Sequence, residues 1–161
     1  MSEYGINSIS SLTFREGVRN RIQMYLGSDD IEGVYQALKE IINNSTDEAL
    51  AGYGKKIEIK LDEDNGISVR DYGRGVPFGI RDNGENVLVA IYTQSHTGGK
   101  FNHDDYKNAS GLNGVGGSCV CLSAKRFKVI SNRDGRYAKA EFEKGILLNY
   151  SEGKTNEKNG T

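Results

Sequence analysis

Two short segments of alternating polar and apolar residues flank an Asn-Gly turn signal, and this pattern constrains the fold more than any other feature. The segments are KIEIKL at 56–61 and ISVRD at 67–71, and DEDNG lies between them. A period of two is typical of strands, and Asn-Gly favours the tight turn of a hairpin. RDG at 133–135 predicts a second hairpin, and GILLNYSE predicts a further strand. A mostly antiparallel sheet is therefore expected.

Other segments follow the helical period. The longest begins near Ile31, after the capping signal SDD, and ends near residue 50. Its predicted apolar face consists of Val34, Leu38, Ile41, Ile42 and Ala49. Shorter helices are expected in FREGVRNRIQMYLG, NVLVAIYTQ and SCVCLSA. Helices and hairpins together predict an α+β fold, a two-layer sandwich with helices covering one face of the sheet.

Composition excludes several classes of protein. The 161 residues suffice for one domain with a core, and the net charge of −1 gives no overall basic field that would indicate DNA binding. The sequence has no apolar run long enough for a membrane span and no secretory signal at its start. Cys119 and Cys121 lack a second cysteine pair, so we interpret them as reduced thiols of a cytoplasmic protein rather than zinc ligands.

A polar stripe on the long helix is the first candidate site. Glu40, Asn44 and Asp47 fall within an arc of about 60° and span roughly 10 Å along the helix axis. A solvated face of an amphipathic helix is the simpler interpretation. The stripe contains no Lys or Arg, however, and Asn in mid-helix is unfavourable, so the wall of a polar site remains the alternative.

Asp71 ends the second strand of the first hairpin and precedes Gly-Arg-Gly. Alternation places it on the face of Ile67 and Val69, which should pack inward, and a buried carboxylate needs hydrogen-bond donors. A turn aspartate that accepts from its own loop explains the pattern equally well. The bare backbone at 73–75 would also let a flat ligand approach closely.

Glycines cluster in the loop at 95–117. The sequence holds 21 Gly against 1 Pro, and the loop ends in GLNGVGG just before a predicted helix. Such a helix start favours anions, although the spacing matches neither the Walker nor the Rossmann phosphate loop. A mobile surface lid and a phosphate-binding loop are both compatible with this segment.

Taken together, these motifs resemble the ATPase domain of type IIA DNA topoisomerases, the gyrase B and topoisomerase IV ParE group of the GHKL superfamily. VRNRIQMYLG, E-x-x-x-N-x-x-DEALAG, DYGRGVP, HTGGKF and GLNGVG occur in the family's order over nearly the whole chain. The resemblance implies the GHKL (Bergerat) ATP-binding fold over residues 13–161, with residues 1–12 as a dimerisation arm. It also implies that the family's domain continues beyond residue 161 with further strands and a transducer domain that supplies a catalytic lysine. Little ATP hydrolysis is therefore expected from these residues alone.

The resemblance also implies roles for individual residues. Glu40 corresponds to the general base, Asn44 to the Mg²⁺ ligand, and Asp71 to the acceptor for the adenine amino group. Tyr4 and Ile9 correspond to the arm that crosses to a second subunit, and Arg133 to a contact for aminocoumarin inhibitors. The remaining implied nucleotide-pocket and lid residues are Asp47, Glu48, Arg74, Gly75, Pro77, Lys100, Tyr106, Leu112, Asn113, Gly114, Val115, Gly116 and Thr161, with Glu48 expected to pair with Arg74.

The implied function is binding of ATP and Mg²⁺ to clamp two subunits and drive DNA strand passage, in the cytoplasm with the nucleoid and without a membrane partner. DNA and the cleavage subunit are expected to contact regions outside this chain. One departure from the family is NNST at 43–46, where an apolar residue is usual at Ser45 or Thr46. Alternatives are a nucleotide-binding module that regulates or inhibits a topoisomerase without hydrolysis, or a mismatch-repair or chaperone ATPase, against which TGGKF and DEALAG argue.

Overall fold

The first predicted hairpin is present in a computed structural model of the chain, which describes residues 11–63, 65–95, 97 and 114–161. Strand β1 (Ile57–Leu61) pairs antiparallel with β2 (Ile67–Asp71), and Leu61 lies opposite Ile67. Asn65 has a φ of 61°, a left-handed conformation that asparagine tolerates better than most residues. The Asn-Gly signal therefore marks the turn correctly.

A second sheet contains three antiparallel strands in the order β3-β4-β5. They are β3 (Arg126–Arg133), β4 (Arg136–Glu143) and β5 (Ile146–Lys154). Asp134 and Gly135 both have positive φ, the conformation of a type I′ hairpin turn, which confirms the turn predicted at RDG. The last residues of the chain link the two sheets, because Gly160 pairs with Asn132 of β3 and the Thr161 carbonyl accepts from Asp71 N of β2.

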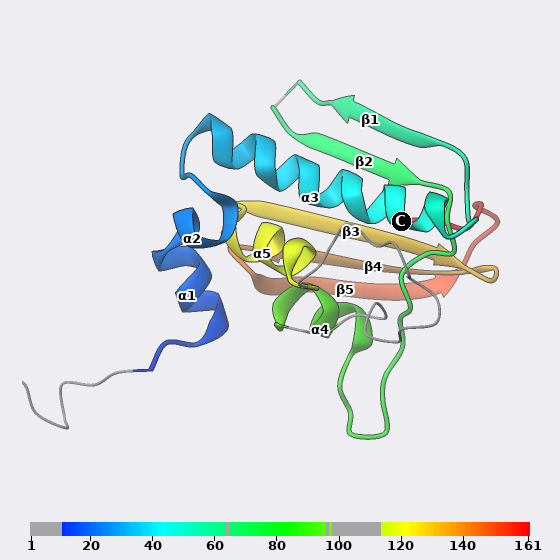
Figure 1. The fold of residues 1–161 in the computed structure, drawn as a ribbon. Helices are drawn as coiled ribbons and strands as arrows, with labels where there is room; N and C mark the ends of the chain where they lie inside the picture. The colour runs from blue at the N-terminus through cyan, green and yellow to red at the C-terminus, as the bar shows by residue number, and fades with distance from the viewer. Residues whose placement is uncertain (1–10, 64, 96, 98–113) are drawn as a thin grey trace, which may run out of the picture.

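Helices cover one face of the larger sheet, and Figure 1 shows α4 (Val87–Thr93) and α5 (Gly116–Ser123) in front of it. The long helix α3 (Ile31–Leu50) runs beside the β1–β2 hairpin. The predicted basic helix is instead two helices, α1 (Phe14–Asn20) and α2 (Ile22–Leu26), because the backbone of Arg21 at φ −138° and ψ 48° is not helical. The α+β prediction with helices on one face is confirmed.

Two groups of buried side chains form the core. One lies between α4, α5 and the three-stranded sheet: Leu88, Tyr92, Cys121, Val129, Ala138, Ala140 and Phe142. The other joins α1, α2 and α5 through Val18, Leu26, Cys119 and Leu122. Both thiols are free, and burial raises the pKa of Cys119 to about 11 and of Cys121 to about 12. These cysteines are packing residues.

Helix α3 differs from its predicted amphipathic pattern. Val34, expected on the apolar face, is 51% exposed, whereas the buried positions are Gly33, Ser45 and Asp47. Gly33 is buried because α3 packs there against the Ser28 backbone. Ser45 is buried because the end of β2 lies against this part of α3. The helix therefore buries the polar residues Ser45 and Asp47 instead of a continuous apolar stripe.

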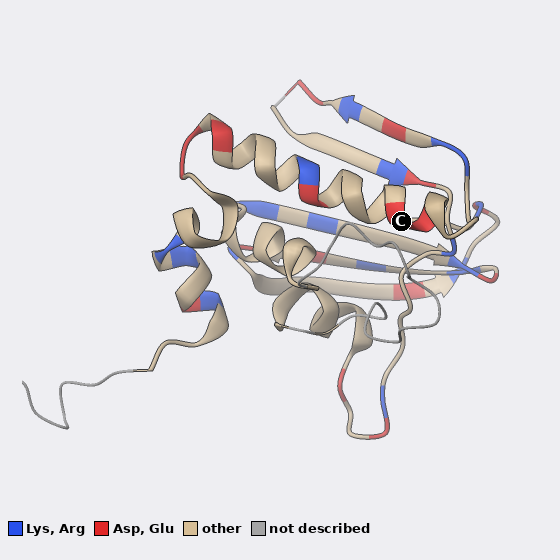
Figure 2. Cartoon of the chain, in the orientation of Figure 1, with Lys and Arg blue, Asp and Glu red and all other residues tan. Residues whose placement is uncertain are grey.

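Charged residues are unevenly distributed over the surface. Figure 2 shows basic residues on α1 and at the start of β3, whereas acidic residues lie at the beginning and in the second half of α3. Within the described part of the chain, no helix is both long and apolar enough to cross a membrane.

Candidate functional site

Asp71 is the buried carboxylate at the centre of the candidate site. It is the last residue of β2 and is 8% exposed. Its Oδ1 accepts from Gly73 N at 2.8 Å and from Thr161 N at 3.3 Å, whereas among the described residues Oδ2 accepts only from Ser45 Oγ at 3.5 Å. Desolvation raises the pKa of this carboxyl, although the two backbone donors act in the opposite direction. Oδ2 can therefore accept a further hydrogen bond from a ligand.

The predicted burial of Asp71 is confirmed, but alternation along β2 does not explain it. Ile67, expected to pack inward on the same face, is 40% exposed. Asp71 is buried because α3 and the end of the chain meet at its end of β2, through Ser45 and Thr161. The turn interpretation of this aspartate is confirmed, because Oδ1 accepts from its own loop at Gly73, and binding of a ligand through Oδ2 stays a prediction.

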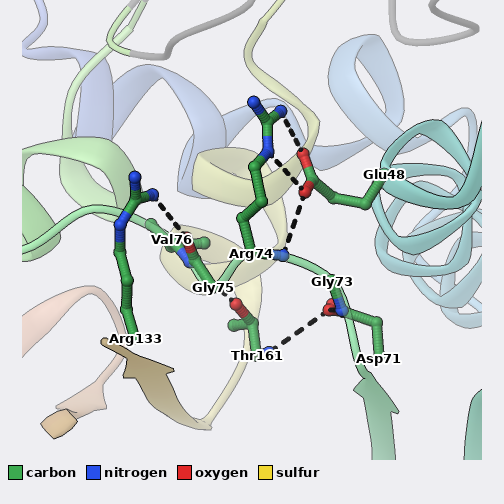
Figure 3. A network of polar contacts seen from close by, with 8 residues as sticks. All are labelled: Glu48, Asp71, Gly73, Arg74, Gly75, Val76, Arg133 and Thr161. Atoms are coloured by element: carbon green, nitrogen blue, oxygen red, sulfur yellow. Dashed lines mark hydrogen bonds and ion pairs between the residues drawn. The ribbon is translucent and has the colours of Figure 1, made fainter. Parts of the chain in front are cut away.

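The loop after Asp71 is fixed by an ion pair with α3. Arg74 Nη2 lies 2.9 Å from Glu48 Oε1, and Arg74 Nε lies 3.1 Å from Glu48 Oε2, so the pair is bidentate (Figure 3). The Arg74 guanidinium also stacks 4.1 Å from the centre of the Tyr53 ring. The predicted pairing of Glu48 with Arg74 is confirmed.

Gly75 lies where the loop crosses the end of β3. Its φ is +77°, and a Cβ there would collide with the Asn132 carbonyl. Arg133 donates from Nη1 to the Gly75 carbonyl at 3.1 Å, and Val76 N donates to Thr161 Oγ1 at 3.0 Å (Figure 3). Only glycine fits this position without strain. The loop that carries the exposed Pro77 is therefore attached to both β3 and the end of the chain.

The polar stripe of α3 faces the beginning of α5. A Cβ on Gly116 would collide with Glu40 Oε2, and one on Gly117 would lie 3.7 Å from Asn44 Nδ2. Gln36 Nε2 donates to Glu40 Oε1 at 2.9 Å. Asp47, one turn beyond Asn44, is 2% exposed. The stripe is thus not a solvated face, and Glu40 and Asn44 lie beside a helix N-terminus that favours negative charge.

The structure therefore brings two predicted groups to neighbouring parts of α3. Glu48, Asp71, Arg74, Gly75, Arg133 and Thr161 form one, and Glu40, Asn44 and Gly116 form the other. Gly114 and Val115 directly precede Gly116 at the start of α5. Outside the described residues lie Tyr4, Ile9, Lys100, Tyr106, Leu112 and Asn113. Among the described residues no group of three or more His, Cys, Asp or Glu side chains could hold a metal ion.

Sequence reasoning missed two residues of this site. Ser45 faces Asp71, and the Tyr92 ring lies beside Gly117. Gly73, in the bare backbone predicted at 73–75, is close enough to both carboxylates that a Cβ there would lie 3.1 Å from Glu48 Oε2 and from Asp71 Oδ1. A serine in place of the usual apolar residue was the available signal for Ser45. Nothing in the alternation of NVLVAIYTQ distinguishes Tyr92 from an ordinary core residue.

Comparison with known proteins agrees with this geometry. Residues 29–144 match the family model described as histidine kinase-, DNA gyrase B- and HSP90-like ATPase. The DNA topoisomerase 4 B-subunit from Mycoplasma capricolum is 42% identical over 91% of this chain and 23% of its own length. The corresponding Enterococcus faecalis protein is 41% identical over 99% of this chain and 24% of its own length.

The fold has a solved counterpart. The 43K ATPase domain of Thermus thermophilus gyrase B, solved in complex with an aminocoumarin, superimposes with a TM-score of 0.76. That match has 33% sequence identity and covers 91% of this chain and 37% of the solved chain. The chain spans about a quarter of the length of the two topoisomerase relatives. By its matched residues and its fold, it belongs to the family of histidine kinase-, DNA gyrase B- and HSP90-like ATPases.

Proposed function

We propose that this chain is the ATP-binding region of a type IIA DNA topoisomerase subunit and that Asp71 recognises the adenine ring. The observation that carries this proposal is the position of Asp71: within the part of the chain that the structure describes, Oδ2 has a single long contact, while Oδ1 accepts two backbone hydrogen bonds. An exocyclic amino group is a donor that suits such an oxygen. The backbone of Gly75 and the hydroxyl of Thr161 form the neighbouring edge.

The phosphates are proposed to extend from this base site toward the start of α5. Helix N-termini bind anions, and Gly116 and Gly117 leave the backbone there uncovered. Asn44 fits Mg²⁺ because its amide oxygen is a hard ligand, and the ion commonly takes only one or two protein ligands besides phosphate and water. Mg²⁺ supplies charge neutralisation at the phosphates when bound. Among the lid residues, Lys100 and Tyr106 remain expectations from the resemblance.

Glu40 is proposed as the general base. Its carboxylate lies beside Gly116 at the phosphate end of the site and is oriented by Gln36. There it can accept a proton from a water molecule that attacks the terminal phosphate, whereas Asp71 at the base end cannot. This position favours an ATP-hydrolysing enzyme over a binding module without catalysis.

In the larger protein, ATP binding is proposed to close two copies of the subunit through the arm that contains Tyr4 and Ile9. This closure would drive DNA strand passage together with the cleavage subunit, in the cytoplasm. Arg133 at Gly75 is the proposed contact for aminocoumarins, because the gyrase B relative was solved with such a molecule.

Base selectivity tests the proposal. Isothermal titration should detect binding of a non-hydrolysable ATP analogue with Mg²⁺ and much weaker binding of the matching GTP analogue. Guanine presents a carbonyl oxygen where adenine has its amino group. This oxygen would face the Asp71 carboxylate, and two acceptors cannot form a hydrogen bond with each other. Equal affinity for the two analogues would contradict recognition by Asp71, and binding of neither would contradict the nucleotide site itself.

A further inference from the structure

The net charge of −1 conceals a local concentration of unpaired positive charge. Many basic side chains form ion pairs with carboxylates, among them Lys56, Arg70, Arg74, Arg81, Arg133, Arg136 and Lys139. Other basic side chains form none within the described residues. Five of these come from α1, the start of β3 and the β4–β5 turn, and we name them the basic cluster: Arg15, Arg19, Lys125, Arg126 and Lys144.

Hydrogen bonds to backbone carbonyls hold the basic cluster together. Arg15 Nε donates to the Lys144 carbonyl at 2.7 Å, and Lys144 N donates to the Lys125 carbonyl at 3.2 Å. Arg19 Nη1 donates to the Leu122 carbonyl at 2.9 Å at the end of α5. Residues from α1, the start of β3 and the β4–β5 turn therefore meet at one place, and Figure 2 shows the basic residues of α1 and of the start of β3 in blue.

The charge of the basic cluster is available to a partner. Lys125, Arg126 and Lys144 are exposed, and the two α1 arginines use only part of their donors on neutral carbonyls. The nearby Glu16 carboxylate accepts from Thr13 N and Oγ1 at 2.9 and 2.8 Å, and its negative charge acts on the neighbouring Arg15. Glu143 faces Arg126 across the β3–β4 pair without forming an ion pair. Positive charge therefore exceeds negative charge on this surface.

We propose that the basic cluster binds the phosphate backbone of duplex DNA without reading its sequence. Guanidinium groups fixed by the backbone match phosphate oxygens, and adjacent lysines add point charges. The choice of DNA over other polyanions rests on the proposed topoisomerase function. It adds a DNA contact within this chain to those expected in other regions of the protein.

The proposal is tested by measuring how the affinity for DNA depends on salt concentration. A fluorescently labelled duplex of about 25 base pairs is titrated with the protein at 50 to 200 mM salt, without nucleotide. The logarithm of the affinity falls by about 0.9 per phosphate contact for each tenfold rise in salt. Lys125→Gln with Lys144→Gln should weaken binding at least tenfold at 50 mM salt and make the slope shallower by about 2. Both side chains are exposed, so folding should be preserved, which thermal unfolding checks.

The matched control removes the same charge elsewhere. Lys55→Gln with Lys60→Gln changes two exposed lysines at and beside β1 and should retain most of the affinity and the original slope. Equal losses in both variants, no binding by the wild type, or preference for vesicles containing phosphatidylserine over DNA would overturn the proposal. ATP-analogue affinity is measured separately, so a failed nucleotide site would leave these DNA results interpretable.

Discussion

Asp71 and Thr161, 90 residues apart, are joined by two hydrogen bonds that run in opposite directions. Asp71 N donates to the Thr161 carbonyl at 2.9 Å, and Thr161 N donates to Asp71 Oδ1 at 3.3 Å. Gly160, the residue before, pairs with Asn132 of β3. The end of the described chain therefore orients the carboxylate and connects the two sheets at the base site.

Thr161→Ala should lower both stability and nucleotide affinity, because Val76 N loses its hydroxyl acceptor. The expected loss in unfolding free energy is about 1 kcal/mol, as for a typical hydrogen bond. Thr161→Ser keeps the acceptor and should behave like the wild type in urea unfolding and in ATP-analogue titration. Identical behaviour of the Ala and Ser variants would argue against a role for the hydroxyl.

Gly116→Ala should impair ATP turnover while leaving the fold intact. The new methyl group meets the far end of the flexible Glu40 side chain, which would rotate away from the phosphate end of the site. Gly17→Ala in α1 is the matched control, because its Cβ would meet the Tyr25 hydroxyl at an ordinary 3.4 Å and the residue lies outside the proposed nucleotide site.

Turnover of these glycine variants is measured in a chimera in which this chain replaces the matching region of the Enterococcus faecalis protein. The wild-type chain alone is expected to hydrolyse ATP no faster than its Glu40→Ala variant. Gly116→Ala turnover equal to that of Gly17→Ala would show that Glu40 does not act from its observed position.

Asn44→Ala should reduce the Mg²⁺ dependence of ATP-analogue binding. Removing the amide oxygen takes away the proposed protein ligand, so affinities with Mg²⁺ and with EDTA should converge. Affinity for adenosine, which lacks phosphates, should change little. Calorimetry with each ligand makes the comparison, and an undiminished Mg²⁺ effect would reassign the ligand.

The local elements of the fold could be predicted because their signals are local. The Asn65 turn and the Asp134–Gly135 turn each follow from a few adjacent residues, whereas the burial of Asp71 depends on contacts with Ser45 and Thr161, which are distant in the sequence. The basic cluster could not be predicted in this way, since hydrogen bonds between α1, β3 and the β4–β5 turn create it. Exposure of Val34 likewise depends on which parts of α3 other elements reach.

Asp71→Asn should gain stability relative to the wild type as pH rises. Burial raises the folded-state pKa of Asp71 above its unfolded value, so ionisation destabilises the folded protein. Below the unfolded-state pKa, the protonated Asp71 carboxyl contributes its full stabilisation of the folded protein. This contribution is lost as the pH rises through the folded-state pKa. Urea unfolding of both proteins between pH 3.5 and about 7 measures this difference, and a constant difference would contradict the assignment.

The most direct test of the central claim is calorimetric titration of the same Asp71→Asn variant with a non-hydrolysable ATP analogue. Asparagine can keep the acceptors for Gly73 N and Thr161 N but presents an amide where the ligand requires a carboxylate oxygen. Loss of a charge-assisted hydrogen bond predicts affinity weaker by about 1.5–3 kcal/mol, or roughly 10- to 150-fold, in a protein that remains folded. Affinity equal to that of the wild type would contradict adenine recognition by Asp71.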